Sequence, residues 1–474
     1  MKKFFAAVLI LLFAVCAFAA GKKNIIFVVA DGGGPAVTGF LMQYAKYAGR
    51  SPYADKTSNL EKLFAVGKTG IVLNSPKDFL VTDSAAAGTH LAKGTLTYPE
   101  YLGLSADGEN ADSLLKKAKK TGMAAGLVTD AFLSDATPSA YTAAVESRKD
   151  YDLITPALLS GSVDVLLGGG LNYFVSKQDL NNPVYSAIFK RIPFAGELTP
   201  KSTDAVFEKL LTSGYPLAFD KTSLQSARGS KLLGLFGAED IQYTINPAPY
   251  APDLLDMTQK AVNILSKNEN GFFLMVEAGA LDSVLHENDQ GAALAELLEL
   301  DKVLGYLKDF ADKTPDTLII VTADHDTGGF GFSYRKLSDE ELAQKQAEGY
   351  KTFGGKDYIS TEVLDIIAKQ TKRQKEMKKE FLSRPQEEQT PQAVQAYLKE
   401  NMAYELPLEV IETAGSFEKS LKEVNKRLGI VWSTKTHTAS PIFVTFYGAS
   451  VSVPNIMHNT QINKIAEDFL YDGK

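Results

Sequence analysis

Short apolar runs alternate with helical patterns along the chain, and this alternation limits the folds that the sequence can adopt. The runs are rich in β-branched or aromatic residues and lie at Ile25–Ala30, Ala125–Thr129, Val163–Leu167, Phe272–Val276, Leu318–Thr322 and Ile442–Tyr447. Almost continuous apolarity is typical of strands buried on both faces of a parallel sheet. Helical patterns lie between the runs, at Asp112–Lys120, Asp253–Ser266 and Ala292–Leu307. The alternation predicts a doubly wound, mostly parallel α/β sheet flanked by helices.

The composition excludes several other classes of protein. The 474 residues are 45% hydrophobic and 23% charged, which fits a globular protein rather than a disordered chain. A single cysteine excludes a disulfide-rich scaffold. The formal net charge of −7 gives no basic footprint, so we expect no nucleic-acid partner.

The N-terminal residues have the pattern of a secretory signal peptide. Two lysines precede an apolar run over residues 4–18, and small residues follow it. We expect a signal peptide at 1–20, cleaved after Ala19 or Ala20, and a periplasmic or secreted protein. The run is shorter than the roughly 20 residues of a membrane span, so no stable anchor is expected after cleavage. The only cysteine, Cys16, would leave with this segment.

Residues 335–430 differ from the rest of the chain. They contain 17 basic and 17 acidic side chains in 96 positions, a higher charged fraction than the chain average. Ser338 and Glu341 have the spacing of a helix capping box. We therefore predict a charged helical insertion that divides one α/β domain into residues 21–334 and 431–474. It forms either a solvated cap with a small core of its own or a lid or dimer contact, and a homodimer stays open.

Carboxylates and imidazoles gather where the predicted strands end. These residues are Asp31, Glu277, Asp282, His286, Asp324, His325 and His437. Ligands of open α/β sheets bind beyond the carboxyl ends of the strands, so these distant segments are expected to meet. Each residue alone could be a turn former or a core histidine, but three of only five histidines take part. Histidine and carboxylate ligands without thiolate suit Zn²⁺, and carboxylates with hydroxyls suit Mg²⁺.

Ser84 is a candidate nucleophile. The small residues after it suggest a helix start whose N–H groups could face an anion, although a plain capped helix start is equally compatible. No Gly-x-Ser-x-Gly turn surrounds Ser84, so a histidine-based hydrolase triad is not indicated. A serine hydroxyl is a weak nucleophile, and a neighbouring metal ion would activate it.

Taken together, these motifs resemble those of the alkaline phosphatases. The matching set, in order and spacing, is Asp31-Gly32, Thr82-Asp83-Ser84-Ala85, Asp135-Ala136-Thr137-Pro138, Arg148, Glu277, Asp282, His286, Asp324-His325 and His437-Thr438. The resemblance covers nearly all of the predicted mature chain outside 335–430. It implies an alkaline-phosphatase-like fold and an exported, metal-dependent phosphomonoesterase that acts on small phosphate monoesters.

The resemblance also implies a role for each matching residue. Ser84 would be the phosphorylated nucleophile, and Arg148 would clamp the phosphoryl oxygens. Of two Zn²⁺ and one Mg²⁺ per chain, one zinc would be bound by Asp31, Asp324 and His325, the other by Asp282, His286 and His437, and the magnesium by Asp31, Thr137 and Glu277 with Asp135 acting through water.

The sequence departs from the family pattern at Ser283, where lysine or histidine is common, and Asp135 favours magnesium over a third zinc. A phosphodiesterase of the same superfamily and a phosphate- or metal-binding relative without catalysis remain alternatives. A sulfatase would need a Ser/Cys-x-Pro-x-Arg sequence, which Ser84 lacks. Arg148 favours a monoester, because a terminal phosphate dianion offers more oxygens for the guanidinium fork.

Overall fold

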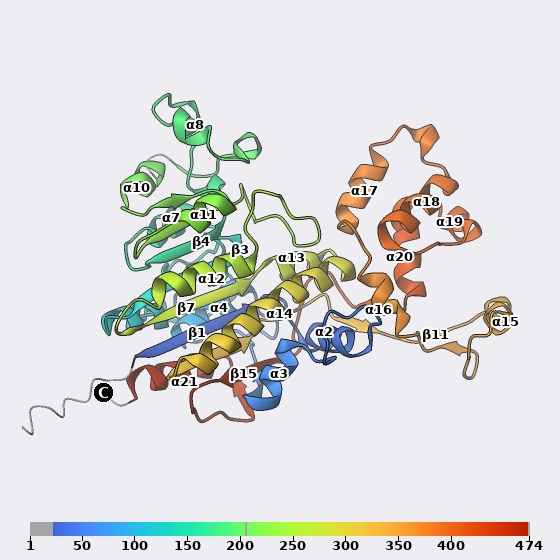
Figure 1. Ribbon diagram of the computed structural model, residues 1–474, viewed down its shortest axis with the longest axis horizontal. Helices are drawn as coiled ribbons and strands as arrows, with labels where there is room; N and C mark the ends of the chain where they lie inside the picture. The colour runs from blue at the N-terminus through green and yellow to red at the C-terminus, as the bar shows by residue number, and fades with distance from the viewer. Residues whose placement is uncertain (1–21, 204–205, 473–474) are drawn as a thin grey trace, which may run out of the picture.

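A ten-stranded sheet organises the chain (Figure 1). The computed structural model describes residues 22–203 and 206–472, so the predicted signal peptide lies outside the described residues. In sheet order the strands are β16 (Ile456–His458), β2 (Lys68–Leu73), β15 (Ile442–Tyr447), β8 (Thr317–Thr322), β1 (Lys23–Ala30), β7 (Gly271–Ala278), β3 (Ala124–Phe132), β4 (Val165–Gly169), β6 (Leu232–Leu235) and β5 (Leu217–Ala218).

The pairing is parallel from β8 across to β5, which confirms the predicted mostly parallel sheet. β15 is the exception and runs antiparallel to both β8 and β2. His437 pairs with Thr327 just beyond the end of β8, and a short connection leads from there to β15. The chain therefore enters β15 at the end of the sheet where β8 stops. A parallel neighbour would instead need a crossover of a dozen or more residues.

Both faces of the sheet are buried. Along β1, the side chains of Ile26 and Val28 belong to one apolar core, and those of Ile25, Phe27 and Val29 belong to the other. This alternation follows from the two-residue period of a strand. Each core is completed by its own set of helices, so the predicted doubly wound arrangement is present.

The first core receives side chains from α2 (Pro35–Tyr47), α3 (Asn59–Val66), α11 (Lys221–Ser226), α12 (Leu254–Leu265), α13 (Ala280–His286) and α14 (Gln290–Lys313). The second receives them from α4 (Ser84–Lys93), α5 (Leu114–Lys120), α6 (Ala136–Ser139), α7 (Tyr151–Leu158), α8 (Lys177–Asn181), α9 (Ser186–Phe189), α10 (Val206–Thr212) and α21 (Thr460–Tyr471). Among the helices that the structure describes, none combines the length and apolarity needed to cross a bilayer.

Residues 335–430 are mainly helical. They contain β11 (Arg335–Lys336), α15 (Asp339–Ala347), β12 (Lys356–Asp357), α16 (Glu362–Ile367), α17 (Gln374–Leu382), α18 (Pro391–Met402), α19 (Leu408–Ala414) and α20 (Phe417–Arg427). The capping box of Ser338 and Glu341 is present at α15. Figure 1 shows α17 to α20 grouped near the N-terminal end of α14. Their apolar side chains, Phe381 and Leu421 among them, join the first core of the sheet, so the apolar interior is continuous.

Candidate active site

Strand register brings the candidate residues to one edge of the sheet. Ala30 is paired with Ala278 and Val29 with Thr322, so the chain leaves β1, β7 and β8 at the same level. Asp31 follows β1 directly, and its N–H donates to the Ala278 carbonyl at 3.2 Å. The Gly32 N–H donates to Asp324 Oδ1 at 3.1 Å. These backbone contacts fix two carboxylates next to each other at the carboxyl ends of the strands, as predicted.

The first cluster consists of Asp31, Asp324 and His325, all buried. His325 Nε2 lies 3.0 Å from Asp324 Oδ2 and 3.7 Å from Asp31 Oδ1. Both of these carboxylate oxygens are buried and accept no hydrogen bond of normal geometry. Burial, with the adjacent Asp324 charge, raises the pKa of Asp31 well above its ordinary value. Buried carboxylates this close together are unfavourable unless a cation neutralises them.

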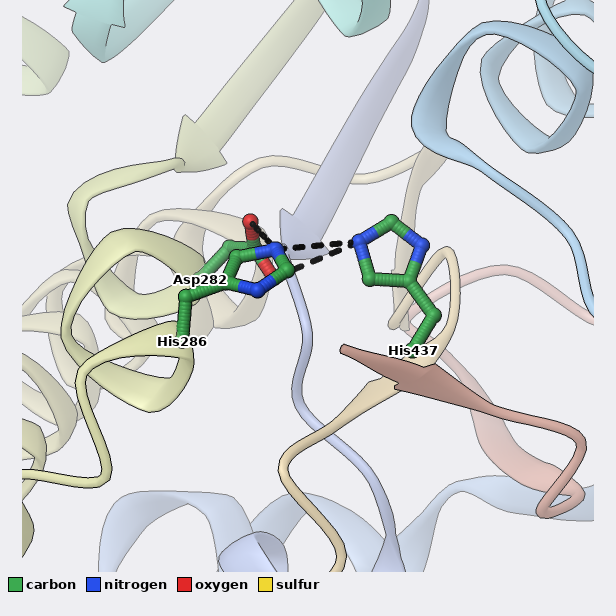
Figure 2. Close-up of side chains that lie close together, drawn as sticks. All are labelled: Asp282, His286 and His437. Atoms are coloured by element: carbon green, nitrogen blue, oxygen red, sulfur yellow. Dashed lines mark hydrogen bonds and ion pairs between the residues drawn. The ribbon is translucent and has the colours of Figure 1, made fainter. Parts of the chain in front are cut away.

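The second cluster consists of Asp282, His286 and His437 (Figure 2). Asp282 and His286 lie one turn apart on α13, and His286 Nε2 is 3.2 Å from Asp282 Oδ2. His437 arrives from the opposite side on β14 (His437–Thr438), which pairs with β9 (Asp326–Thr327). As a result, the Nε2 atoms of the two histidines are 3.2 Å apart.

Backbone carbonyls fix the tautomers of both histidines. His286 Nδ1 lies 2.6 Å from the Lys435 carbonyl, and His437 Nδ1 lies 2.9 Å from the Thr82 carbonyl. A carbonyl only accepts, so each Nδ1–H donates and each Nε2 lone pair points into the space shared with Asp282. This is the usual arrangement of metal-binding histidines. The hydrogen bond that protonated His286 donates to Asp282 raises the pKa of His286 to about 8, so a metal ion would compete with a proton here.

Thr327 connects the two clusters. Its hydroxyl donates to Asp282 Oδ1 at 2.6 Å and lies 3.2 Å from His325 Nδ1. With the hydroxyl proton committed to Asp282, the Thr327 oxygen accepts from His325 Nδ1–H. The Nε2 lone pair of His325 is thereby directed at the two carboxylates of its own cluster. Thr327 is not predictable from the sequence, because no spacing signal distinguishes it from an ordinary strand threonine.

Ser84 stands at the start of α4, buried, with its Oγ 3.1 Å from His325 Nε2. The predicted helix start is present. The N–H groups of the next two residues, however, donate to the Asp83 carboxylate at 3.2 and 3.1 Å. Asp83 therefore caps the helix as an N-cap residue does, and these two N–H groups are not free to face an anion.

Two carboxylates hold the guanidinium of Arg148, and one of them belongs to Asp83, which directly precedes Ser84. Nη1 is 3.2 Å from Asp83 Oδ2, and Nη2 is 3.0 Å from Asp135 Oδ1. Burial opposes its positive charge, but Asp135 and Asp83 keep the pKa of Arg148 above its ordinary value. The side chain is 20% exposed, so part of it faces solvent.

Glu277 and Thr137 form a third group of buried polar atoms. Both Glu277 carboxylate oxygens and the Thr137 hydroxyl are buried and lack a hydrogen-bond partner of normal geometry. Burial, and next the Asp135 charge, raises the pKa of Glu277 to about 8, against a smaller lowering by hydrogen bonds with Thr129 and Thr137. Asp31 also interacts electrostatically with Glu277. Oxygen donors of this kind suit a hard divalent cation such as Mg²⁺.

Comparison with known proteins agrees with this geometry. The sequence profile of the family described as alkaline phosphatase matches residues 22–471. The chain belongs to the alkaline phosphatase family. It is an enzyme of that family, and the family and fold support a phosphomonoesterase.

Relatives of this family match over most of the chain. Alkaline phosphatase 4 of Bacillus subtilis is 29% identical over 464 residues, which is 95% of this chain and 89% of that protein. Alkaline phosphatase of Escherichia coli is 32% identical over 351 residues, which is 64% of this chain and 70% of that protein. The Thermus thermophilus alkaline phosphatase structure has a TM-score of 0.74 at 25% identity and covers 95% of this chain and 92% of that one.

Proposed function

We propose that this alkaline phosphatase is exported, depends on bound metal ions and hydrolyses phosphate monoesters through a phosphoserine at Ser84. One observation carries the proposal: Ser84 Oγ lies 3.1 Å from His325 Nε2, within a site where two compact carboxylate–histidine clusters meet. The predicted signal peptide supports export. An inactive binding relative would have no need of a buried serine placed against one of the clusters.

The residues present fit two zinc ions and one magnesium ion. One zinc would be held by Asp31, Asp324 and His325, the other by Asp282, His286 and His437, and the magnesium by Asp31, Thr137 and Glu277 with Asp135 through water. The support is the set of buried oxygens that lack a hydrogen-bond partner of normal geometry, together with the fixed histidine tautomers. When bound, such ions neutralise the phosphate dianion and make both the attacking and the leaving oxygen less basic.

The side chains of the protein would then act in a definite order. Arg148 keeps N–H donors beyond the two that Asp83 and Asp135 occupy, and these would hold non-bridging phosphoryl oxygens. Ser84 Oγ loses its proton and forms a bond to phosphorus as the bond from phosphorus to the alcohol oxygen breaks, and the departing oxygen takes up a proton and leaves as the alcohol. Water then attacks the phosphoserine, which releases inorganic phosphate and restores the Ser84 hydroxyl.

Turnover of a chromogenic phosphate monoester against the matching diester tests the substrate class. We expect kcat/KM for the monoester to be larger by at least about 10²-fold, because a diester lacks one of the charged oxygens that Arg148 and the cations would hold. Arg148→Ala should reduce monoester turnover more than diester turnover. A diester hydrolysed faster than the monoester would contradict the proposal and favour a phosphodiesterase.

Thr327→Val tests whether the hydroxyl that joins the two clusters tunes the metal sites. The change keeps the shape but removes the hydrogen bonds to Asp282 and His325. We expect zinc affinity to fall about 10- to 100-fold, as for other residues that orient metal ligands. Competition with a chromogenic chelator measures it. Thr327→Ser retains the hydroxyl and is the matched control, and equal affinities for the valine variant and the wild type would exclude this role.

A further inference from the structure

We propose that Arg373 is a positioning residue that holds α13, and with it the site formed by Asp282, His286 and His437. Arg373 belongs to the 335–430 segment and directly precedes α17. The inference rests on the proposed function, because it assumes that this cluster holds a metal ion. Under this inference, the charged insertion stabilises the position of α13 at the active site.

The Arg373 side chain is 13% exposed and contacts groups on both sides. Its guanidinium carbon lies 3.8 Å from the centroid of the Tyr243 ring. Nη1 donates to Glu287 Oε1 at 3.3 Å, and Nε and Nη2 donate to Glu376 Oε1, each at 3.1 Å. Stacking together with charge-assisted hydrogen bonds is a combination that arginine makes and lysine does not.

Glu287 is the first contact with the metal-ligand helix. It follows His286 directly, and its second oxygen, Oε2, is buried without a hydrogen-bond partner. Lys375 also reaches Glu287, at 3.1 Å, but its side chain is 71% exposed. Arg373 is therefore the less exposed of the two cations that contact this carboxylate. Removing it would leave a partly buried carboxylate, one residue from His286, paired with the exposed Lys375 alone among these two cations, and such a carboxylate moves toward water.

Tyr243 provides the second contact, with Ser283, which lies on α13 one turn before Glu287. Burial raises the pKa of Tyr243 to about 12, against a smaller lowering by a hydrogen bond with Ser283. Ser283 follows Asp282 directly, at the position where the family resemblance leads one to expect lysine or histidine. Ser283 and Glu287 are four residues apart and share a helix face. Arg373 thus reaches α13 next to both of its metal-ligand candidates, through Tyr243 and through Glu287.

A separate anchor keeps the insertion in place without Arg373. The buried Asp289, at the N-cap of α14, accepts from the Gln374 N–H at 2.5 Å and from Gln370 Nε2 at 2.6 Å. The segment around Arg373 is therefore fixed to the corner between α13 and α14 by groups that an Arg373 substitution leaves intact. We expect such a substitution to act locally on α13 and to leave the fold in place.

Zinc titration of the full chain against a competing chelator tests the inference. Arg373→Ala should weaken one of the two zinc affinities about 10-fold and leave the other unchanged. Arg373→Lys retains a charge for Glu287 but loses the stack, so it should lie between Arg373→Ala and the wild type. With only five histidines in the chain, NMR of the histidine rings shows whether His286 and His437 lose zinc before His325.

Arg384→Ala is the matched control. Arg384 also lies over aromatic rings, 5.1 Å from Phe381 and 4.8 Å from Tyr397, but within the insertion. Zinc affinity of Arg384→Ala should equal that of the wild type. Unchanged zinc affinity in both Arg373 variants, or equal weakening of both sites together with a lower Tm, would overturn the inference. A wild-type protein that binds no zinc would instead contradict the proposed function itself.

Discussion

Ser84→Ala is expected to lower kcat for phosphate monoesters by at least about 10³-fold, since loss of a catalytic nucleophile costs this much or more. The wild-type chain should carry a phosphoryl group on Ser84 when it is quenched during turnover, and the variant should not. Initial rates with a chromogenic monoester and mass spectrometry of the Ser84 peptide measure the two effects. The helix itself should persist, because Asp83 and not Ser84 caps α4.

Phosphate binding separates a lost nucleophile from a damaged site. Inorganic phosphate should still bind to Ser84→Ala in calorimetry, because Arg148 and the metal-ligand candidates are unchanged. Ser75→Ala, a substitution in the loop before α4, is the matched control and should keep wild-type activity. Activity of Ser84→Ala within about tenfold of the wild type would exclude Ser84 as the nucleophile.

Removal of the metal ions is expected to have an effect of similar size. Without them, buried carboxylates face the place where the phosphate dianion must sit, and the pKa of Asp31 is raised by burial and, next, by repulsion from Asp324. Dialysis against a strong chelator should reduce monoester turnover by at least about 10³-fold, since the cations supply most of the charge neutralisation. Zinc together with magnesium should restore it.

Thermal unfolding supplies an independent reading of metal removal. A ligand at about 1,000 times its Kd stabilises the folded state by about 4 kcal/mol per site, so Tm should fall on chelation and recover with zinc. Circular dichroism at low temperature should stay unchanged, because none of the proposed metal ligands belongs to the two apolar cores of the sheet. Full activity after verified removal of zinc and magnesium would contradict the proposed metal requirement.

The sequence was sufficient to predict the centre of the fold. Apolar runs such as Ile25–Ala30 and Leu318–Thr322 became β1 and β8, because a strand buried on both faces needs apolar residues at every position. The sequence analysis did not predict β2, β6 or the edge strands β5 and β16. For the two edge strands the reason is their length. They are two and three residues long, too short for any period to show. The direction of β15 also could not be read from its composition, since it depends on where the chain enters the sheet.

The candidate site was predictable to the extent that strand ends define it. Asp31 and Asp324 were placed by the rule for carboxyl ends of parallel strands, and Asp282 and His286 by helix spacing. Thr327 and Arg373 were not predictable from the sequence. Thr327 acquires its place through the pairing of β9 with β14, and Arg373 through the docking of 370–374 on Asp289. Such contacts depend on long-range packing, which leaves no local pattern.

Diffraction at the zinc absorption edge, from crystals of the purified protein, tests the central claim most directly. The proposal predicts two anomalous peaks per chain, one among Asp31, Asp324 and His325 and one among Asp282, His286 and His437, with Ser84 Oγ beside the first. Zinc-replete crystals with no peak in either cluster, from protein that is fully active, would contradict it.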